Sequence, residues 1–213
     1  MIASKRTYLL EIIAIASVFI VNELFFSTIK YSSQMAEVIS LILITYFFSK
    51  RGSSWKDAGF QKPKSWWKAV VYFILCVATI GLTFNFIIQP LFPTGANGIS
   101  HEEPLSLAQM IIELLLVGIG TAAIGEEMLF RGFLLNNINK LLGKNLMSTL
   151  LAILIQAICF AVLHSGLQGM VSAGVIGIIL GIFYVLSGRN LWVVMAAHAV
   201  PDVLSFISSY QNQ

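Results

Sequence analysis

Long apolar stretches separated by short polar loops run along this 213-residue chain. Each is near the ~20 residues with which a helix crosses the hydrocarbon of a bilayer. They are continuously apolar, without the alternation of lipid-facing β-strands, which favours helices over a barrel. The pattern predicts an all-α polytopic transmembrane bundle of about seven to eight helices, forming one integral membrane domain over residues 1–213. The stretches cover residues 7–30, 34–49, 67–89, 108–135, 146–164, 170–187 and 190–209.

Composition narrows the class of protein. Only 11% of the residues are charged and 57% are apolar, whereas an ordinary soluble domain has about 25% charged residues. A soluble enzyme, a disulfide-stapled secreted domain and a disordered tail are therefore excluded. The net charge of +3 comes from loop residues rather than a basic patch with interleaved aromatics, so nucleic acid is not an expected partner. Membrane lipid is the expected environment.

The distribution of Lys and Arg predicts the orientation of the bundle. Basic residues concentrate before the first stretch and in the loops after the second, fourth and sixth stretches. Short cytoplasmic loops carry such an excess, so we expect the N-terminus in the cytoplasm. The loop at 90–107 has neither Lys nor Arg, which is typical of the outer face. The Ile-rich residue usage fits a bacterium, so we expect a bacterial plasma membrane.

Small and ionisable residues inside the stretches have different expected roles. Glycines recur at three and four residues in the sixth stretch, which predicts close packing of a neighbouring helix. An ionisable residue costs about 2.5–3.5 kcal/mol at a helix centre, so each is a functional candidate by default. Glu11, Glu23, Glu37 and Glu113 nevertheless lie near predicted helix ends, within reach of water or head groups, and we expect structural roles for them.

The fourth stretch contains two adjacent carboxylates, Glu126 and Glu127, followed by Arg131. Residues four apart lie on one face of an α-helix, so Glu127 can pair with Arg131 inside its own helix. Glu126 points about 100° away and finds no such partner. The segment therefore holds either an ion pair with a spare carboxylate at the membrane edge, or a functional Glu126.

Two later stretches carry histidines. Phe160 and His164 stand four residues apart at the end of the fifth, and His198 and Asp202 stand four apart in the seventh. Pro201 lies between the last two and removes one helical hydrogen bond, which predicts a bent, polar site. Tilted or bent helices would let these groups meet Glu126 near the middle of the membrane.

These three segments together resemble the CAAX-protease and bacteriocin-processing family, also called the Abi family, of intramembrane proteases. The family pattern is Glu-Glu-x-x-x-Arg, then Phe-x-x-x-His, then His-x-x-x-Asn or Asp on successive helices. Every position is filled here, and the resemblance covers about residues 108–205, which are then the catalytic helices. The prenyl-protein proteases of the family have Asn where this chain has Asp202. An ionised Asp can only accept hydrogen bonds, so Asp202 has three possible roles: an oxyanion partner, an anchor for a protonated His198, or a metal ligand.

The resemblance implies hydrolysis of a peptide bond within the membrane, as a glutamate or metallo-endopeptidase. By analogy, Glu126 and His164 would activate the water, while His198 and Asp202 would stabilise the oxyanion. The implied substrate is a membrane-associated peptide or a lipidated protein, in the manner of CAAX prenyl proteases or of bacteriocin processing and self-immunity.

The resemblance implies that the remaining motif residues support the site. It leaves open whether the site binds a metal ion. Glu127, Arg131 and Phe160 would hold the catalytic helices in place. Two histidines with carboxylates suit Zn²⁺, for which the four catalytic candidates are also the candidate ligands, but the chain has no His-Glu-x-x-His helix.

Two other classes of function use the same residues. A non-catalytic bacteriocin immunity or peptide-binding membrane protein would keep the motifs without the chemistry. A proton-coupled transporter would use the buried Glu and His side chains as a relay, although the sequence shows no inverted pair of broken helices.

Overall fold

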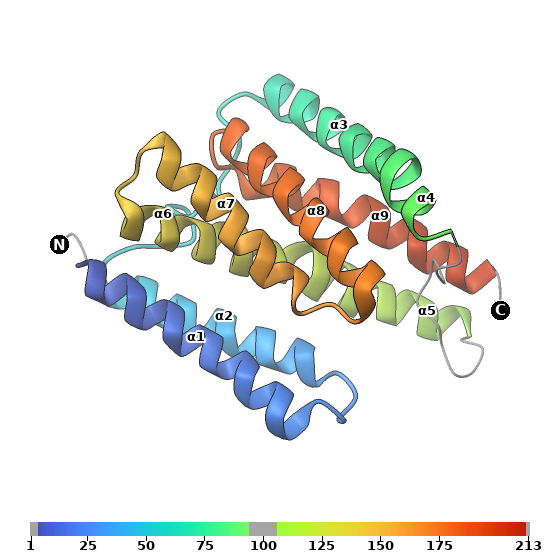
Figure 1. Ribbon diagram of the computed structural model, residues 1–213, viewed down its shortest axis with the longest axis horizontal. Helices are drawn as coiled ribbons and strands as arrows, with labels where there is room; N and C mark the ends of the chain where they lie inside the picture. Colours follow the sequence, from blue (N-terminus) through green and yellow to red (C-terminus); the bar gives the residue numbers. More distant parts are fainter. Residues whose placement is uncertain (1–3, 94–105, 212–213) are drawn as a thin grey trace.

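The computed structural model describes residues 4–93 and 106–211, and its regular elements over these ranges are all helical (Figure 1). Two segments, η1 and η2, are π-helices that continue α-helices at both ends. The elements are α1 (Lys5–Phe26), α2 (Ser32–Lys50), α3 (Trp66–Thr83), η1 (Phe84–Ile88), α4 (Gln89–Leu91), α5 (Leu107–Glu113), η2 (Leu114–Leu135), α6 (Asn136–Leu142), α7 (Leu146–Ala161), α8 (Gly166–Leu186) and α9 (Leu191–Gln211).

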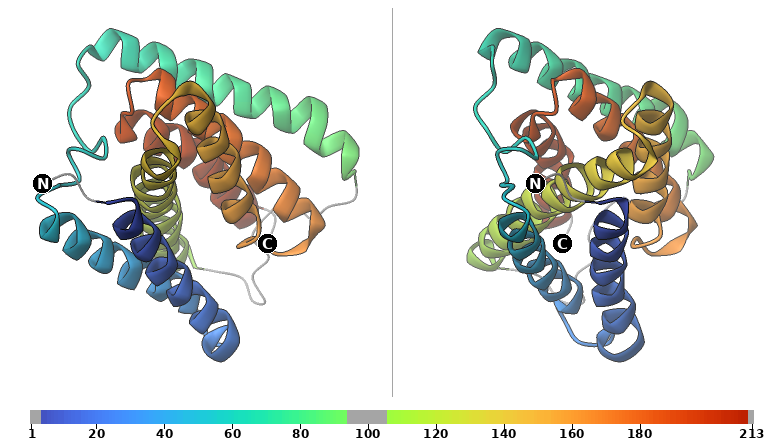
Figure 2. Two further views of the ribbon diagram at one scale, coloured as in Figure 1. Left: turned by 60° about the vertical axis from the view of Figure 1, so that its left-hand side comes forward. Right: turned by 90° about the vertical axis from the view of Figure 1, so that its left-hand side faces the viewer.

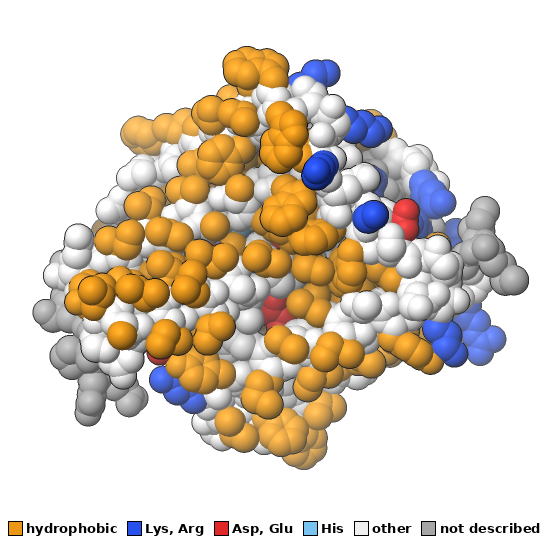
Figure 3. Space-filling model, turned by 180° about the vertical axis from the view of Figure 1, so that it is seen from behind, with side chains coloured by type: hydrophobic (Ala, Val, Ile, Leu, Met, Phe, Trp, Pro, Cys, Tyr) orange, Lys and Arg blue, Asp and Glu red, His pale blue; other side chains and the backbone are white. Residues whose placement is uncertain are grey.

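The predicted polytopic helical bundle is confirmed. Six helical segments of the described residues are long and apolar enough to cross a membrane, two of them joined from several elements, 66–91 and 107–142. The fifth predicted stretch is shorter than expected, because α7 has 16 residues and ends at Ala161 rather than reaching 164. Hydrophobic side chains cover much of the outer surface (Figure 3). An apolar surface of this extent suits lipid rather than water, and the chain is an integral membrane protein.

The helix η2 occupies the centre of the bundle. It packs against α2, α7 and α9. The α1–α2 hairpin lies on one side of it, and α3 lies on the other side with α8 and α9 (Figures 1 and 2). Side chains on η2 can therefore meet groups from three helices that are distant in the sequence.

The predicted close packing at the glycines of α8 is confirmed. A Cβ on Gly177 would lie 3.2 Å from the Cα and Cβ atoms of Ala157 in α7, and one on Gly181 would lie 3.0 Å from Gln156 Nε2. Larger side chains would push α7 and α8 apart. The close approach also exposes the Gly177 carbonyl to Gln156, whose Nε2 donates to it over 2.8 Å.

Basic loops gather at one end of the bundle. Lys140 is within electrostatic range of Arg51, Lys144 and Arg189, which come from three different loops or helix ends. Glu11 has the structural role expected of it, since it pairs with Arg51 over 2.6 Å. The assignment of this end to the cytoplasm stays a prediction. Most of the 90–107 loop, which was expected on the outer face, lies outside the described residues (94–105).

Candidate active site

The pairing expected of Glu127 is present, although the helix that carries it is of a different type. Arg131 Nη1 donates to Glu127 Oε1 over 2.8 Å, and neither side chain is exposed. Glu126 keeps 24% of its side chain exposed. The segment is a π-helix rather than the α-helix expected from the sequence. Its residues are apolar on nearly all sides, so their pattern has no period that distinguishes the two helix types, and π-helical turns are often found at functional sites.

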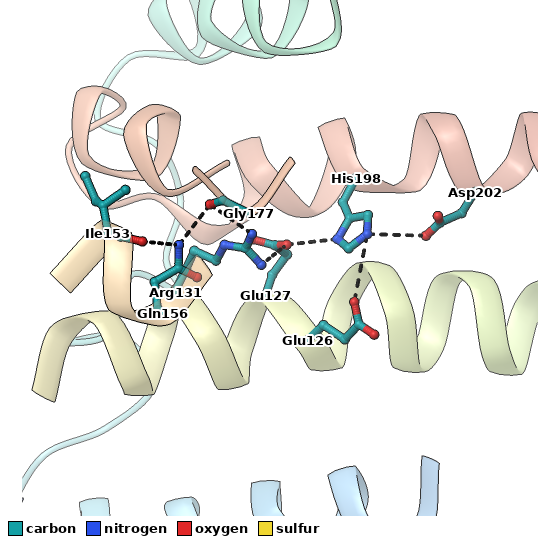
Figure 4. A network of polar contacts seen from close by, with 8 residues as sticks. All are labelled: Glu126, Glu127, Arg131, Ile153, Gln156, Gly177, His198 and Asp202. Carbon is teal, nitrogen blue, oxygen red and sulfur yellow. Dashed lines mark hydrogen bonds and ion pairs between the residues drawn. The ribbon is translucent and has the colours of Figure 1, made fainter. Parts of the chain in front are cut away.

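Glu127 has a second partner that sequence reasoning missed. His198 of α9 donates from Nδ1 to the same Oε1 atom over 2.9 Å (Figure 4). On the other side, Arg131 Nη2 lies 3.4 Å from the Gly177 carbonyl oxygen of α8. The Glu127–Arg131 pair therefore ties η2 to both α8 and α9. Local spacing could not reveal the contact with His198, because the two residues are 71 positions apart.

The other ring nitrogen of His198 faces two carboxylates. Nε2 lies 3.9 Å from Glu126 Oε2 and 3.8 Å from Asp202 Oδ2 (Figure 4). Both distances exceed a hydrogen bond but lie within the range of an ion pair. The structure therefore brings Glu126 and Asp202 to the same ring nitrogen of His198, and their catalytic roles stay a prediction. Asp202 Oδ2 is buried without a hydrogen-bond partner among the described residues.

His164 lies in the turn after α7 and is held by its own segment. Its Nδ1 is 2.9 Å from the Phe160 carbonyl oxygen, and its ring packs edge-on against the Phe160 ring, with 4.7 Å between centroids. A carbonyl can only accept, so Nδ1 carries the proton and Nε2 of the neutral ring is free to accept. Phe160 also packs edge-on against His198 and lies under the Arg131 guanidinium, as expected of a supporting residue.

Burial sets the protonation state of His164. The loss of hydration lowers the pKa of His164 below its ordinary value, and the nearby His198 and Arg131 act in the same direction, while the hydrogen bond to the Phe160 carbonyl opposes them. The imidazole is therefore neutral at physiological pH, with Nε2 available as a hydrogen-bond acceptor.

A cavity of about 640 Å³ lies beside this cluster of polar residues. Its wall is formed by α1, α2, η2, the end of α7 and the turn after it, and it includes both Glu126 and His164. His198 and Asp202 are not among the described residues that line it. Glu126 therefore stands between the cavity and the buried His198, and could act on a molecule bound in the cavity.

Glu37, like Glu11, is more deeply buried than was expected of a residue near a helix end. It was expected to contact water or head groups near a helix end, whereas the structure buries it to 6% exposure. It lines the same cavity as Glu126 and His164. The only signal in the sequence was that Glu37 is a carboxylate within an apolar stretch. Several other acidic residues share this feature and make ordinary structural contacts.

The described side chains lack the arrangement that a metal ion needs. Within residues 4–93 and 106–211, no three His, Cys, Asp or Glu side chains are arranged to hold a metal ion. His198 Nδ1 is already bonded to Glu127, and its Nε2 is the only nitrogen between Glu126 and Asp202. The described donor side chains therefore do not fit the Zn²⁺ site that the resemblance left open, and no step below is derived through a metal.

Residues 108–204 match the family model described as Rce1-like, type II CAAX prenyl endopeptidase Rce1-like. This segment is similar to that family, and we call it the Rce1-like segment. The resemblance read from the three motifs is thereby confirmed, over nearly the same residues. The Rce1-like segment contains Glu126, His164, His198 and Asp202, but it does not contain α1 or α2, which complete the cavity wall. No curated protein and no solved structure matches the chain.

Proposed function

We propose that this protein is an intramembrane endopeptidase that hydrolyses a peptide bond in a membrane-associated peptide or lipidated protein. The observation that carries the proposal is a cavity inside the bundle with Glu126 and His164 on its wall. The Rce1-like match supports the same class of reaction. Water is the nucleophile, because the cavity wall offers a carboxylate and a neutral imidazole to take its proton.

Glu126 is the proposed general base. Unlike Glu127, it has no hydrogen-bonded cation among the residues that the structure describes, so its carboxylate remains free to accept a proton. His164 accepts a second hydrogen bond from the water through Nε2 and so fixes its position. The water proton moves to Glu126, the hydroxide oxygen bonds to the scissile carbonyl carbon, and the carbonyl oxygen gains the negative charge.

His198 is the proposed electrostatic partner of this step. Arg131 carries a permanent positive charge and is hydrogen-bonded to Glu127, while Glu126 and Asp202 face His198 Nε2 without such a partner. A proton on His198 therefore brings the charges of the cluster nearer to balance. The resulting imidazolium stands next to Glu126 and stabilises negative charge that develops at the cavity wall. Asp202 and Glu127 hold this imidazolium in place from its two sides.

An apolar chamber beside the cavity supports a lipidated substrate. This second cavity, of about 200 Å³, shares Phe19, Leu129 and Phe130 with the first, and its described lining residues are all apolar. A prenyl or acyl chain could occupy it while the peptide reaches Glu126.

The proposal is tested by a cleavage assay with purified protein in liposomes. Two peptides of one sequence, with and without an S-farnesyl group on a cysteine, are supplied, and the products are identified by mass spectrometry. The wild type should cut the farnesylated peptide more efficiently. His164→Ala should lower kcat by about 10²-fold, whereas Ser165→Ala, a neighbouring exposed residue on the same wall, should leave it unchanged. Full activity of His164→Ala would contradict the assigned chemistry.

The pH dependence of cleavage follows from the lowered pKa of His164. As the pH falls through this pKa, the ring takes a proton, Nε2 stops accepting from the water, and the rate falls. We expect the midpoint of this acid limb in kcat/KM to lie below the value of about 6.5 of an ordinary histidine. A midpoint well above that value would show that another group controls the limb.

Metal chelation is expected to leave the reaction intact. Because no three donor side chains among the described residues converge, incubation with 1,10-phenanthroline followed by gel filtration should change kcat/KM by less than about twofold. Loss of activity that is restored by added Zn²⁺, and not by Mg²⁺, would show instead that the donors rearrange around a metal.

A further inference from the structure

Glu37 of α2 is a buried carboxylate that the proposed mechanism leaves without a role. It is only 6% exposed and lines the cavity that holds Glu126. Its Oε1 atom has no hydrogen-bond partner among the described residues. An unpaired buried carboxylate is costly, so its presence calls for a functional explanation.

A glycine in η2 accommodates this carboxylate. Glu37 Oε1 lies so close to Gly125 that a Cβ at this position would overlap with it and would stand 2.9 Å from Glu37 Cδ. Only a residue without a side chain lets the carboxylate approach the η2 backbone here. Gly125 directly precedes Glu126, so the contact brings the two carboxylates to the same part of the cavity wall.

The charges around Glu37 disfavour a second anion. Glu126 of η2 and His198 of α9 are the charged or titratable groups that act on it directly, and Glu23 of α1 and His164 lie on the same cavity wall. The described lining residues include no Lys or Arg. Two neighbouring carboxylates in a site of low polarity cannot both ionise easily, and one proton is then held between them.

We propose that Glu37 is the general acid of the reaction and works with Glu126 as a pair that holds one proton. This inference rests on the proposed function. This places an acid on the one wall of the cavity that the Rce1-like segment does not supply. The α1–α2 hairpin then completes the site with a proton donor that is separate from Glu126.

The Glu37–Glu126 pair accounts for every proton transfer in one catalytic cycle. In the free protein Glu37 is neutral and Glu126 is ionised. Glu126 takes a proton from water as the hydroxide adds to the carbonyl carbon. Glu37 then gives its proton to the amide nitrogen as the carbon–nitrogen bond breaks, which releases an amine and a carboxylic acid. Transfer of the proton from Glu126 to Glu37 restores the starting state.

The first test replaces the proton donor with an isosteric amide. Glu37→Gln should lower kcat by about 10²–10³-fold and change KM by less than about threefold, because the amide keeps the shape of the side chain. The alkaline limb of the kcat profile, where Glu37 loses its proton, should disappear. Glu23→Gln on the same wall is the matched control and should keep both values and the profile. Unchanged kcat and pH profile in Glu37→Gln would overturn this inference while leaving endopeptidase activity established.

The second test probes the contact between the two helices. Gly125→Ala displaces the Glu37 carboxylate and should lower kcat in the wild-type background. Because both substitutions remove the same donor, Gly125→Ala should have little further effect in Glu37→Gln. Additive losses would show that the alanine acts elsewhere and would contradict the contact as the cause.

The third test needs no substrate. Infrared spectra of protein with ¹³C-labelled glutamate should show a neutral carboxyl band at pH 7 that is lost in Glu37→Gln and kept in Glu23→Gln. This outcome supports the shared proton even where no peptide has yet been found to be cut. Absence of the band in folded wild-type protein would overturn the inference.

Discussion

Glu126→Gln should reduce cleavage by about 10²–10⁴-fold, because the amide has nearly the shape of the carboxylate but cannot take a proton from water. Glu126 is the carboxylate of the motif that reaches the cavity without a hydrogen-bonded cation, and its Oε2 lies 3.9 Å from His198 Nε2. The loss should fall on kcat rather than on KM, since the substrate contacts remain. Single-turnover cleavage in liposomes measures it directly.

The control for this variant is its neighbour in the same motif. Glu127→Gln keeps the proposed base but weakens the hydrogen bonds to Arg131 and His198, so it should lower thermal stability as well as activity. Glu126→Gln should unfold at nearly the wild-type temperature. If it keeps more than about a tenth of the wild-type kcat, the base lies elsewhere and the proposed chemistry is wrong.

Arg131→Ala is expected to be the most destabilising single change in the bundle, by about 3–5 kcal/mol. The guanidinium has no exposed surface, donates to Glu127 over 2.8 Å and packs on the Phe160 ring. Its removal leaves the Glu127 carboxylate buried beside His198 alone and opens a cavity between η2, α7 and α8. The free energy of unfolding in mixed micelles, followed by circular dichroism during a denaturant titration, measures the effect.

Removing both charges should recover part of this loss. In Glu127→Gln/Arg131→Met no uncompensated charge remains in the core, so the double variant should be more stable than Arg131→Ala. Lys30→Ala serves as a surface control, since the Lys30 side chain is 75% exposed in its ion pair with Glu113. An Arg131→Ala protein as stable as Lys30→Ala would show that the buried pair does not hold the helices together.

The sequence was sufficient for the class of fold and for part of the site. Continuous apolar stretches of membrane length have few alternatives to helices, because unpaired backbone groups are too costly in hydrocarbon. The spacing of Glu127 and Arg131 also predicted their pair, since residues four apart on a helix meet whatever the rest of the chain does. The different surroundings of Glu126 followed from the same local geometry.

Long-range packing decided the rest. His198 bonds to Glu127 because α9 lies against η2, and no periodicity within either segment encodes that register. His164 fell in a turn because α7 ended three residues earlier than its apolar stretch. Glu37 shows most clearly what local sequence cannot predict, since only the packing of α2 on Gly125 distinguishes it from the other acidic residues of the apolar stretches.

By itself, then, the sequence determined that the chain is an integral membrane helical bundle and which short motifs carry ionisable groups, because hydrophobic length and helical spacing are local properties. Tertiary structure alone decided which of those groups share a cavity, which are locked into buried pairs, and that the α1–α2 hairpin adds a carboxylate to the site. Those outcomes depend on how helices distant in the sequence pack. The sequence of a helix that is apolar on all sides does not specify how the helix is rotated about its own axis, because packing against the neighbouring helices sets that rotation.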